Sequence, residues 1–299
     1  MSILSPTATA LPTVSAEVMR SPGYWQTVGR RLRNDRVSMV CLTILVLILF
    51  AAVFAPILAP ADPYKASMLH RLKAVGTAGH LLGTDELGRD MLSRLMYGAR
   101  LSLLMGGLPI GIAFVIGTTV GVTAGFVGGR LNMAVMRILD VFYAFPSVLL
   151  AVAISGALGP GMLNSLISLT VVFVPPITRV AESVTTQVRR LDYIDAARMS
   201  GAPSRVIVRV QVLGNVMGPV FVYATGQISV CMILASGMSF LGLGVKPPEP
   251  EWGLMLNTLR SAIYVNPVVA ALPGALIFVT SLCFNLLADG TRLAMDIRD

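Results

Sequence analysis

The chain has 299 residues, of which 55% are hydrophobic and 13% charged, with a mean hydropathy of +0.77 and a formal net charge of +8. A soluble domain carries about 25% charged residues, so this composition excludes an ordinary soluble protein and predicts a polytopic membrane protein built from helices. The basic residues are spread between apolar runs and form no single patch, which argues against nucleic acid as a partner.

The N-terminal region is polar and leads into the first apolar run. Residues 1–36 carry five arginines, and residues 37–59 carry no charge. A run of 23 residues can cross a bilayer and exceeds a typical signal-peptide core. We therefore predict an uncleaved first span that is entered from the cytosol and ends near Pro56 and Pro60.

A second polar segment covers residues 60–99 and contains several acids with arginines close by. The charged side chains at its end are Asp85, Glu86, Arg89, Asp90 and Arg94, and Arg100 follows directly after it. Clustered acids can bind a cation, but the neighbouring arginines offset their charge. The expectation is a surface loop held by local ion pairs, with a cation site as the alternative.

Two long uncharged stretches follow. Residues 101–129 contain glycines four apart, a spacing that lets helix backbones approach closely within a membrane. These glycines are Gly107 and Gly111, and then Gly117, Gly121 and Gly125. We predict a second span packed among other helices, with a turn at residues 128–130. A Ser/Gly/Pro-rich turn at residues 155–161 divides residues 141–178 into a third and a fourth span.

Residues 191–215 form a polar, Arg-rich segment that predicts a helix, a glycine turn and a second helix. Asp192 can cap the first helix and Asp195 follows three residues later, where acids favour the positive end of the helix dipole. Gly201 can adopt the left-handed conformation that ends a helix, and Pro203 suits the first turn of the next. The basic residues of the second helix are Arg205 and Arg209. From these residues alone, an ordinary cytosolic loop remains the alternative.

The last two spans are predicted at residues 217–241 and 261–288, which makes six. With both termini in the cytosol, fifteen Lys and Arg residues fall in cytosolic segments and eight outside. This excess on the inner side supports the orientation and places residues 191–215 in the cytosol.

The sequence contains no recognised catalytic or nucleotide-binding motif. It has three lysines, none in a GxxxxGK[ST] phosphate loop, and neither HExxH nor GxSxG occurs. The three cysteines lie in apolar runs and are interpreted as small buried hydrophobes. We therefore expect no enzyme activity, bound cofactor or metal in this chain.

A proton-coupled carrier is the competing class of membrane protein, and it would need ionisable groups at mid-membrane. The only acids near span boundaries are Asp140 and Asp289, both at predicted cytosolic ends. Asp140 is expected to pair with Arg137, one helical turn away.

Three segments carry a resemblance to one family. Asp195-Ala196-Ala197, with Gly201 after three further residues, resembles the "EAA" coupling loop of importer-type ABC permeases. LLGTDELGRDMLSRLMYGAR (residues 81–100) and SFLGLGVKPPEPEWG (residues 239–253) resemble segments of dipeptide, oligopeptide and nickel permeases. The match runs from about Tyr24 to Asp296, so the chain is similar to the C-type permease subunits of that family.

The resemblance implies an inner-membrane protein with the type I ABC importer permease fold and six transmembrane helices. It also implies a second homologous permease, two cytosolic ATPases that bind ATP and Mg, and an external solute-binding protein. Its cargo would be a peptide, nickel or a related small solute. The implied organisation is a cytosolic segment at 1–36, a helix and external segment at 37–97, a transporter domain at 98–289 with coupling loop 191–215, and a cytosolic tail at 290–299.

Within the loop, the resemblance implies that Ala196, Ala197 and Gly201 contact the ATPase or shape the turn that does. The other site residues that it implies are Asp192, Asp195, Pro203, Arg205 and Arg209. Three positions depart from the family pattern: its Glu is Asp195, its Ile is Gln211, and its Pro is Gly214. Gly214 permits a break before Asn215 but does not impose one, so the docking half of the loop is predicted and the hinge is left open.

Overall fold

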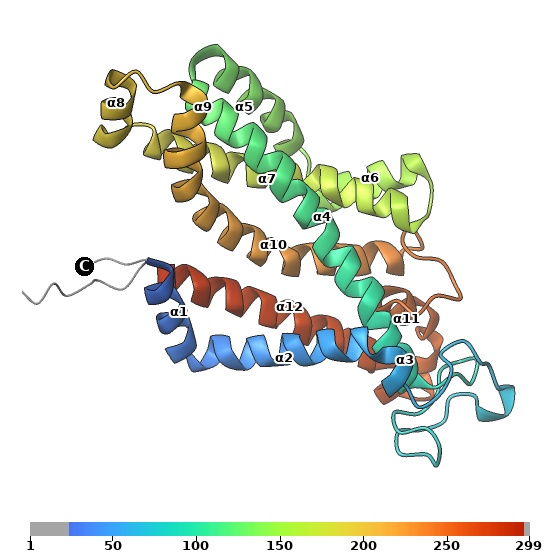
Figure 1. Ribbon diagram of the computed structural model, residues 1–299. Helices are drawn as coiled ribbons and strands as arrows, with labels where there is room; N and C mark the ends of the chain where they lie inside the picture. Colours follow the sequence, from blue (N-terminus) through green and yellow to red (C-terminus); the bar gives the residue numbers. More distant parts are fainter. Residues whose placement is uncertain (1–23, 296–299) are drawn as a thin grey trace, which may run out of the picture.

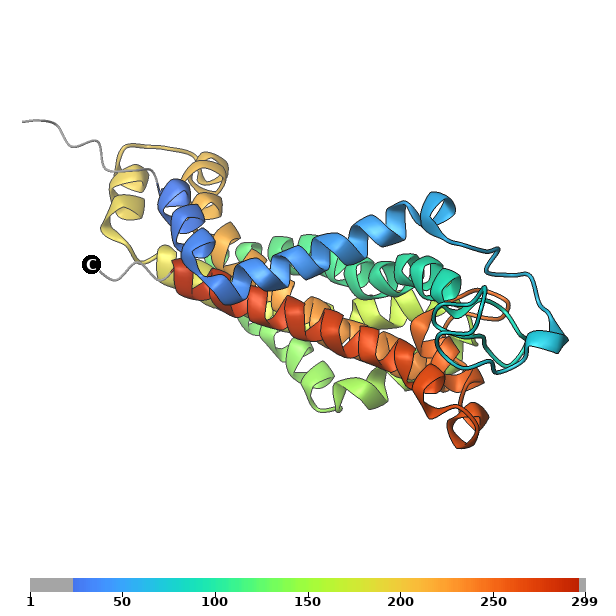
Figure 2. The same cartoon turned by 90° about the horizontal axis from the view of Figure 1, so that it is seen from below.

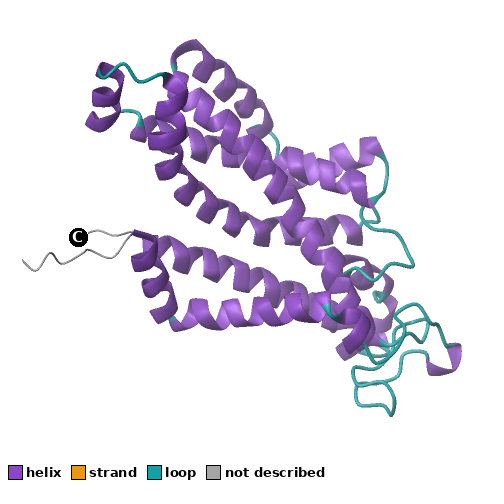
Figure 3. Ribbon diagram, viewed as in Figure 1, coloured by secondary structure: helices purple, strands orange, loops and turns teal. Residues whose placement is uncertain are grey.

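The computed structural model describes residues 24–295, which form a bundle of helices (Figures 1 and 3). Within that range the only strand-like pairings are two isolated β-bridges among residues 77–90. Before the turn at Gly128 the elements are α1 (Tyr24–Asn34), α2 (Arg36–Val53), α3 (Ala55–Leu58), η1 (Met68–His70) and α4 (Met91–Val127). After it come α5 (Gly129–Tyr143), α6 (Ser147–Leu158), α7 (Met162–Val188), α8 (Asp192–Met199), α9 (Ser204–Ile207), the π-helix η2 (Val208–Val212), α10 (Leu213–Phe240), α11 (Trp252–Thr258), η3 (Ser261–Tyr264) and α12 (Pro267–Met295).

Five helices among the described residues are long and apolar enough to cross a membrane, namely α2, α4, α7, the continuous Ser204–Phe240 helix and α12. The pair α5–α6 meets the same criterion jointly but is bent by 86°. The six predicted spans are therefore reached when the bent pair counts as one span. The all-α polytopic class is confirmed.

The bend between α5 and α6 is a feature that the sequence analysis did not predict. Pro146 stands immediately before α6, and the residue ahead of a proline disfavours the helical conformation. Because residues 141–154 carry no charge, their composition gives no sign of the interruption.

Several predicted helix boundaries are displaced. Helix α4 begins at Met91, ten residues before the predicted span, because Asp90 accepts a hydrogen bond from the Ser93 amide at 2.8 Å and caps it. Helix α12 begins at Pro267, since the preceding residues form the separate turn η3. A short helix, α11, also occupies the loop before η3.

The fifth span is one continuous helix from Ser204 to Phe240. It contains the π-helix η2 and passes through Gly214 without interruption. The break before Asn215 that Gly214 would permit is absent. A glycine keeps the backbone N–H that a proline lacks, so the helix can continue at this position.

The most extensive helix pairing among the described residues is between α4 and α7. A Cβ added at Gly121 would lie 2.7 Å from the Ala181 Cβ, and one added at Gly125 would lie 2.9 Å from the Thr185 Cβ. Gly117 makes a similar approach to α7, whereas Gly107 and Gly111 face open space. Close packing through small residues is thus confirmed for three of the five glycines.

Three buried clusters hold the bundle together, the smallest of which joins Cys41 and Leu45 of α2 to Cys283 of α12. The largest joins α4, α7 and α10 and extends to Ile194 of α8, and the second surrounds Trp252 between α4, α11 and α12. All three cysteines are buried, as expected, and they carry free thiols. Figures 1 and 2 show α8 and α9 at one end of the bundle, together with α1 and the end of α12. The loops between α3 and α4 lie at the opposite end.

Candidate functional site

The segment from Leu191 to Asn215 folds as a short helix, a turn and the start of the long fifth span. Helix α8 begins at Asp192, and the residue in the capping position is Leu191, which makes no side-chain cap bond. The prediction that Asp192 is the cap is therefore wrong by one residue. Asp192 and Asp195 instead both lie in the first turn, where their charges face the positive end of the helix dipole.

Gly201 ends α8 as predicted, with a φ of +76°. The Gly201 amide bonds the Arg198 carbonyl at 3.0 Å, and the Ala202 amide bonds the Ala197 carbonyl at 3.2 Å. This pair of bonds is the Schellman arrangement that requires a left-handed residue. A Cβ added at Gly201 would meet nothing within 4 Å, so the backbone conformation alone calls for glycine. Pro203 stands just before α9 and not within its first turn, which corrects the expectation by one residue.

Helix α8 is anchored to the bundle along one side. Ile194 and Ile207 are fully or almost fully buried in the largest core cluster, and Ala197 packs half-buried against the same cluster. Arg198 pairs with Asp195 at 3.1 Å and lies over the ring of Phe126 from α4. The Asn215 amide donates to the Tyr193 hydroxyl at 3.0 Å, which links α8 directly to α10. These contacts attach the segment to α4, to α10 and to the core of the bundle.

The other side of the segment is exposed. Of the predicted site residues, Asp192, Asp195, Ala196, Gly201, Pro203, Arg205 and Arg209 are exposed, and Ala197 is half-buried. The structure adds exposed apolar residues that the sequence analysis missed: Leu191, Tyr193, Met199, Val206 and Val210. Met199 is 90% exposed. The sequence could have indicated these residues, because each is an apolar side chain within an otherwise polar loop.

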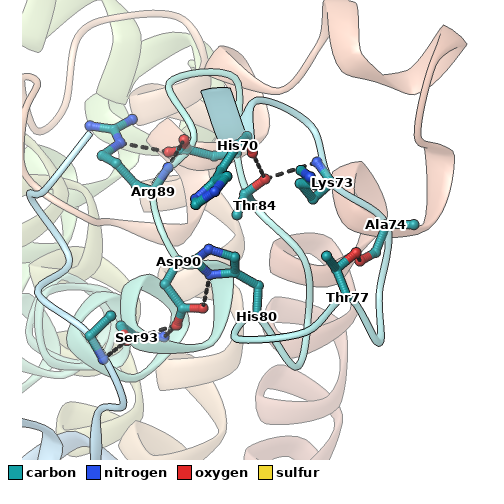
Figure 4. Close-up of polar contacts among 11 residues, drawn as sticks. His70, Lys73, Ala74, Thr77, His80, Thr84, Arg89, Asp90 and Ser93 are labelled. Atoms are coloured by element: carbon teal, nitrogen blue, oxygen red, sulfur yellow. Dashed lines mark hydrogen bonds and ion pairs between the residues drawn. The ribbon is translucent and has the colours of Figure 1, made fainter. Parts of the chain in front are cut away.

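The polar segment before α4 is more enclosed than a surface loop. Asp85 pairs with Arg89 at 2.6 Å and with Arg94 at 3.2 Å, and all three side chains are buried. His80 Nδ1 lies 3.0 Å from the buried Asp90 carboxylate, and Figure 4 shows the imidazole ring directed at it. The local ion pairs were predicted correctly, but their exposure was not. Among the described residues, no cluster of His, Cys, Asp or Glu could hold a metal ion.

The loop before α11 closes the same end of the bundle. Trp252 is buried and its indole N–H donates to the Leu95 carbonyl at 3.0 Å. Glu251 caps α11 by accepting from the Gly253 and Leu254 amides, both at 2.8 Å. Burial raises the pKa of the Glu251 carboxyl above its ordinary range, while the two amide bonds oppose that shift. These contacts hold α4 and α11 together.

The two acids near span boundaries behave differently from each other. Asp140 pairs with Arg179 of α7 at 2.5 Å, so the prediction of Arg137 as its partner is wrong. Arg179 also lies over the ring of Tyr143. Asp289 forms no ion pair within the described part of the chain.

Comparison with known proteins identifies the family. Residues 117–295 match the family described as "Binding-protein-dependent transport system inner membrane component", and residues 23–74 match the "N-terminal TM domain of oligopeptide transport permease C". The di/tripeptide transport system permease protein DppC of Pseudomonas aeruginosa is 42% identical over 91% of this chain and 90% of its own length. The glutathione transport system permease protein GsiD of Pectobacterium atrosepticum is 37% identical over 96% and 94%, respectively.

A solved structure supports the fold. The MetNI methionine ABC transporter in an inward-facing conformation matches with a TM-score of 0.55, over 70% of this chain and 98% of the matched chain, at 21% identity. The architecture is therefore that of an ABC importer permease, as the resemblance implied. The chain belongs to the family of binding-protein-dependent transport system inner membrane components, as a multi-pass permease subunit of an ABC importer and not an enzyme.

Proposed function

We propose that this permease imports short peptides or a closely related small solute, driven by ATP that separate subunits hydrolyse. The support is the similarity, over more than nine-tenths of the chain, to relatives named for di/tripeptide and glutathione transport. Nickel or another solute is the alternative cargo for the same role.

In this proposal the segment from Leu191 to Asn215 receives a cytosolic ATPase. The observation that supports it is a helix exposed on one side and anchored on the other. Asp192, Asp195 and Ala196 point outward, whereas Ile194 is buried in the core. Ala196 leaves little bulk on the exposed side, so a partner surface can approach the helix axis closely.

The other parts of the assembly follow from the same role. Two ATPases bind ATP and Mg, a second homologous permease lies beside this chain in the lipid, and a solute-binding protein delivers cargo from outside. Both termini lie in the cytosol. Support for this orientation comes from the Lys and Arg excess on that side and from the position of α1, α8 and the end of α12 at one end of the bundle.

The test is to co-express the chain with its sister permease and ATPases and to measure ATPase co-purification and ATP-dependent uptake of a labelled dipeptide. Ala196→Trp adds bulk to the contact, and overpacking of about 1–3 kcal/mol weakens docking roughly 5- to 150-fold. Ala66→Trp, at an exposed alanine at the opposite end, is the matched control. We expect the first variant to lose the ATPases and the second to keep them.

Ala196→Trp variants that assemble and transport like wild type would show that this segment is an ordinary loop. The substitution is made at Ala196 because Ala197 packs against this chain's own core. Uptake by the purified chain alone, driven only by a proton gradient, would establish the carrier alternative instead.

A further inference from the structure

A cavity of about 650 Å³ lies between α7, α10 and α12. Its apolar wall includes Val180, Val184 and Val222. Five polar side chains also line it: Tyr223, Gln227, Asn285, Asp289 and Arg292. They come from α10 and from the second half of α12, the half that ends beside α1 in Figure 1.

None of these five side chains forms a hydrogen bond or ion pair with another described residue. Asp289 and Arg292 lie three residues apart on α12, and yet their charged groups are more than 4.0 Å apart. The equally spaced Asp195 and Arg198 of α8 do pair, at 3.1 Å. The acid and the base on α12 are therefore both available to a third group.

Tyr223 and Gln227 are half-buried on α10, where an unpaired polar side chain is costly unless it lines a water-filled cavity. Asn285, Asp289 and Arg292 are exposed, and the last two lie at the predicted cytosolic end of α12. Here an acid, a base, two amides and a phenol converge on one space. A short peptide with free ends carries the complementary set, since it has an ammonium, a carboxylate and a peptide bond that both donates and accepts. A hydrocarbon chain offers none of these groups.

We propose that this cavity is a binding site for the two charged ends of a short peptide in transit through the membrane. Asp289 accepts the peptide ammonium, Arg292 donates to the peptide carboxylate, and Gln227 and Asn285 pair with the peptide bond. The inference rests on the proposed function and adds a site to it.

The dimensions fit a peptide of two residues. A rise of 1.5 Å per residue separates Asp289 and Arg292 by about 4.5 Å along the axis, and a dipeptide spans about 7 Å at most. A volume of about 650 Å³ lies within the range of small-ligand sites. A second cavity of about 540 Å³ also includes Asn285 and continues between α10 and α12 to Leu256 of α11. The cavity therefore has a neighbour along the same helix pair, toward the opposite end of the bundle.

The test measures equilibrium binding to the complete importer in nanodiscs, without nucleotide or binding protein. The probes are Ala-Phe, N-acetyl-Ala-Phe and Ala-Phe amide. Wild type should bind Ala-Phe at least about tenfold more tightly than either blocked peptide, because a hydrogen bond to a charged group contributes that much. Asp289→Asn should weaken Ala-Phe and the amide by about tenfold and leave N-acetyl-Ala-Phe unchanged.

Arg292→Gln should show the opposite pattern, weakening Ala-Phe and N-acetyl-Ala-Phe and leaving the amide unchanged. Glu86→Gln and Arg30→Gln remove an acid and a base away from the cavity and should change no affinity. Three results would overturn the site. The first is no binding of Ala-Phe by wild type up to about 10 mM, because a site of millimolar affinity would show binding in that range. The second is equal wild-type affinity for Ala-Phe and the two blocked peptides, and the third is an equal loss of affinity for all three peptides in either variant.

Two further results would assign the charged groups to another partner. Loss of the sister permease from both variants would mean that the two charges pair across the subunit interface. If both variants lose co-purified phosphatidylethanolamine and do not show the opposite peptide selectivities described above, a zwitterionic lipid occupies the cavity. Peptide uptake by proteoliposomes that contain the wild-type importer separates a failure of the proposed import function from a failure of the proposed cavity site. Absent ATP-driven uptake contradicts the proposed function, whereas normal uptake with unselective binding contradicts only this site.

Discussion

The contact between α4 and α7 gives the sharpest prediction, because Gly121→Ala adds one methyl group to a site that has no room for it. The new Cβ would lie 2.7 Å from the Ala181 Cβ and 2.9 Å from the Glu182 backbone N. Ordinary contacts between carbon atoms lie at about 3.5–4.0 Å, so the helices must separate by roughly 1 Å. The neighbours include backbone atoms, so a side-chain rotation cannot relieve the overlap.

Overpacking of this kind costs about 1–3 kcal/mol, and the rigid surroundings place Gly121→Ala near the upper limit. Alanine returns about 1 kcal/mol because it favours a helix more than glycine does. The net loss is about 2 kcal/mol, which lowers the unfolding midpoint by about 3 °C in a chain of this size.

The three buried cysteines provide the assay, since a thiol-reactive fluorescent dye labels them only when the helices separate. Midpoints are compared at one scan rate in the same detergent, because unfolding of such a protein is irreversible. Gly107→Ala, on the same helix and with nothing within 4 Å, should not lower the midpoint. A Gly121→Ala midpoint equal to wild type would refute the close contact between α4 and α7.

Three more predictions concern the two ends of the bundle. Arg94→Gln removes one partner of the buried Asp85 and should cost about 3 kcal/mol of stability. The unfolding midpoint measured by thiol labelling should therefore fall, whereas Arg260→Gln at an exposed site should leave it unchanged. Gly201→Val should reduce uptake more than Gly201→Asn, because asparagine tolerates the left-handed conformation; equal uptake would contradict a role for that turn. Asn215→Leu removes the bond to Tyr193, so we expect normal ATPase co-purification but less peptide imported per ATP hydrolysed; unchanged stoichiometry would show that this bond does not carry coupling.

Local sequence features predicted the glycine turn at Gly201 and the helical class, because both depend on residues close together in the chain. The orientation of Ala197 could also have been predicted. It lies three residues after the apolar Ile194 and so shares its face of α8, which the core covers.

Long-range features were not accessible in the same way. Arg179 lies 39 residues from Asp140, and no local rule selects it over Arg137, which is nearer in the chain. The cavity beside Asp289 depends on how α10 and α12 diverge, and helix periodicity does not specify that divergence. The bend at Pro146 was visible in the sequence, but the uncharged composition around it suggested a straight span.

The bend between α5 and α6 has a consequence for the surrounding membrane. Helix α6 has 12 residues and is about 18 Å long, whereas the hydrocarbon layer is about 30 Å thick. One end of α6 therefore lies inside that layer. At its start, the amides of Ser147, Val148 and Leu149 have no acceptor within the described residues. Because acyl chains cannot accept hydrogen bonds, these amides require an acceptor at this depth, supplied by water or by a partner subunit beside the bend.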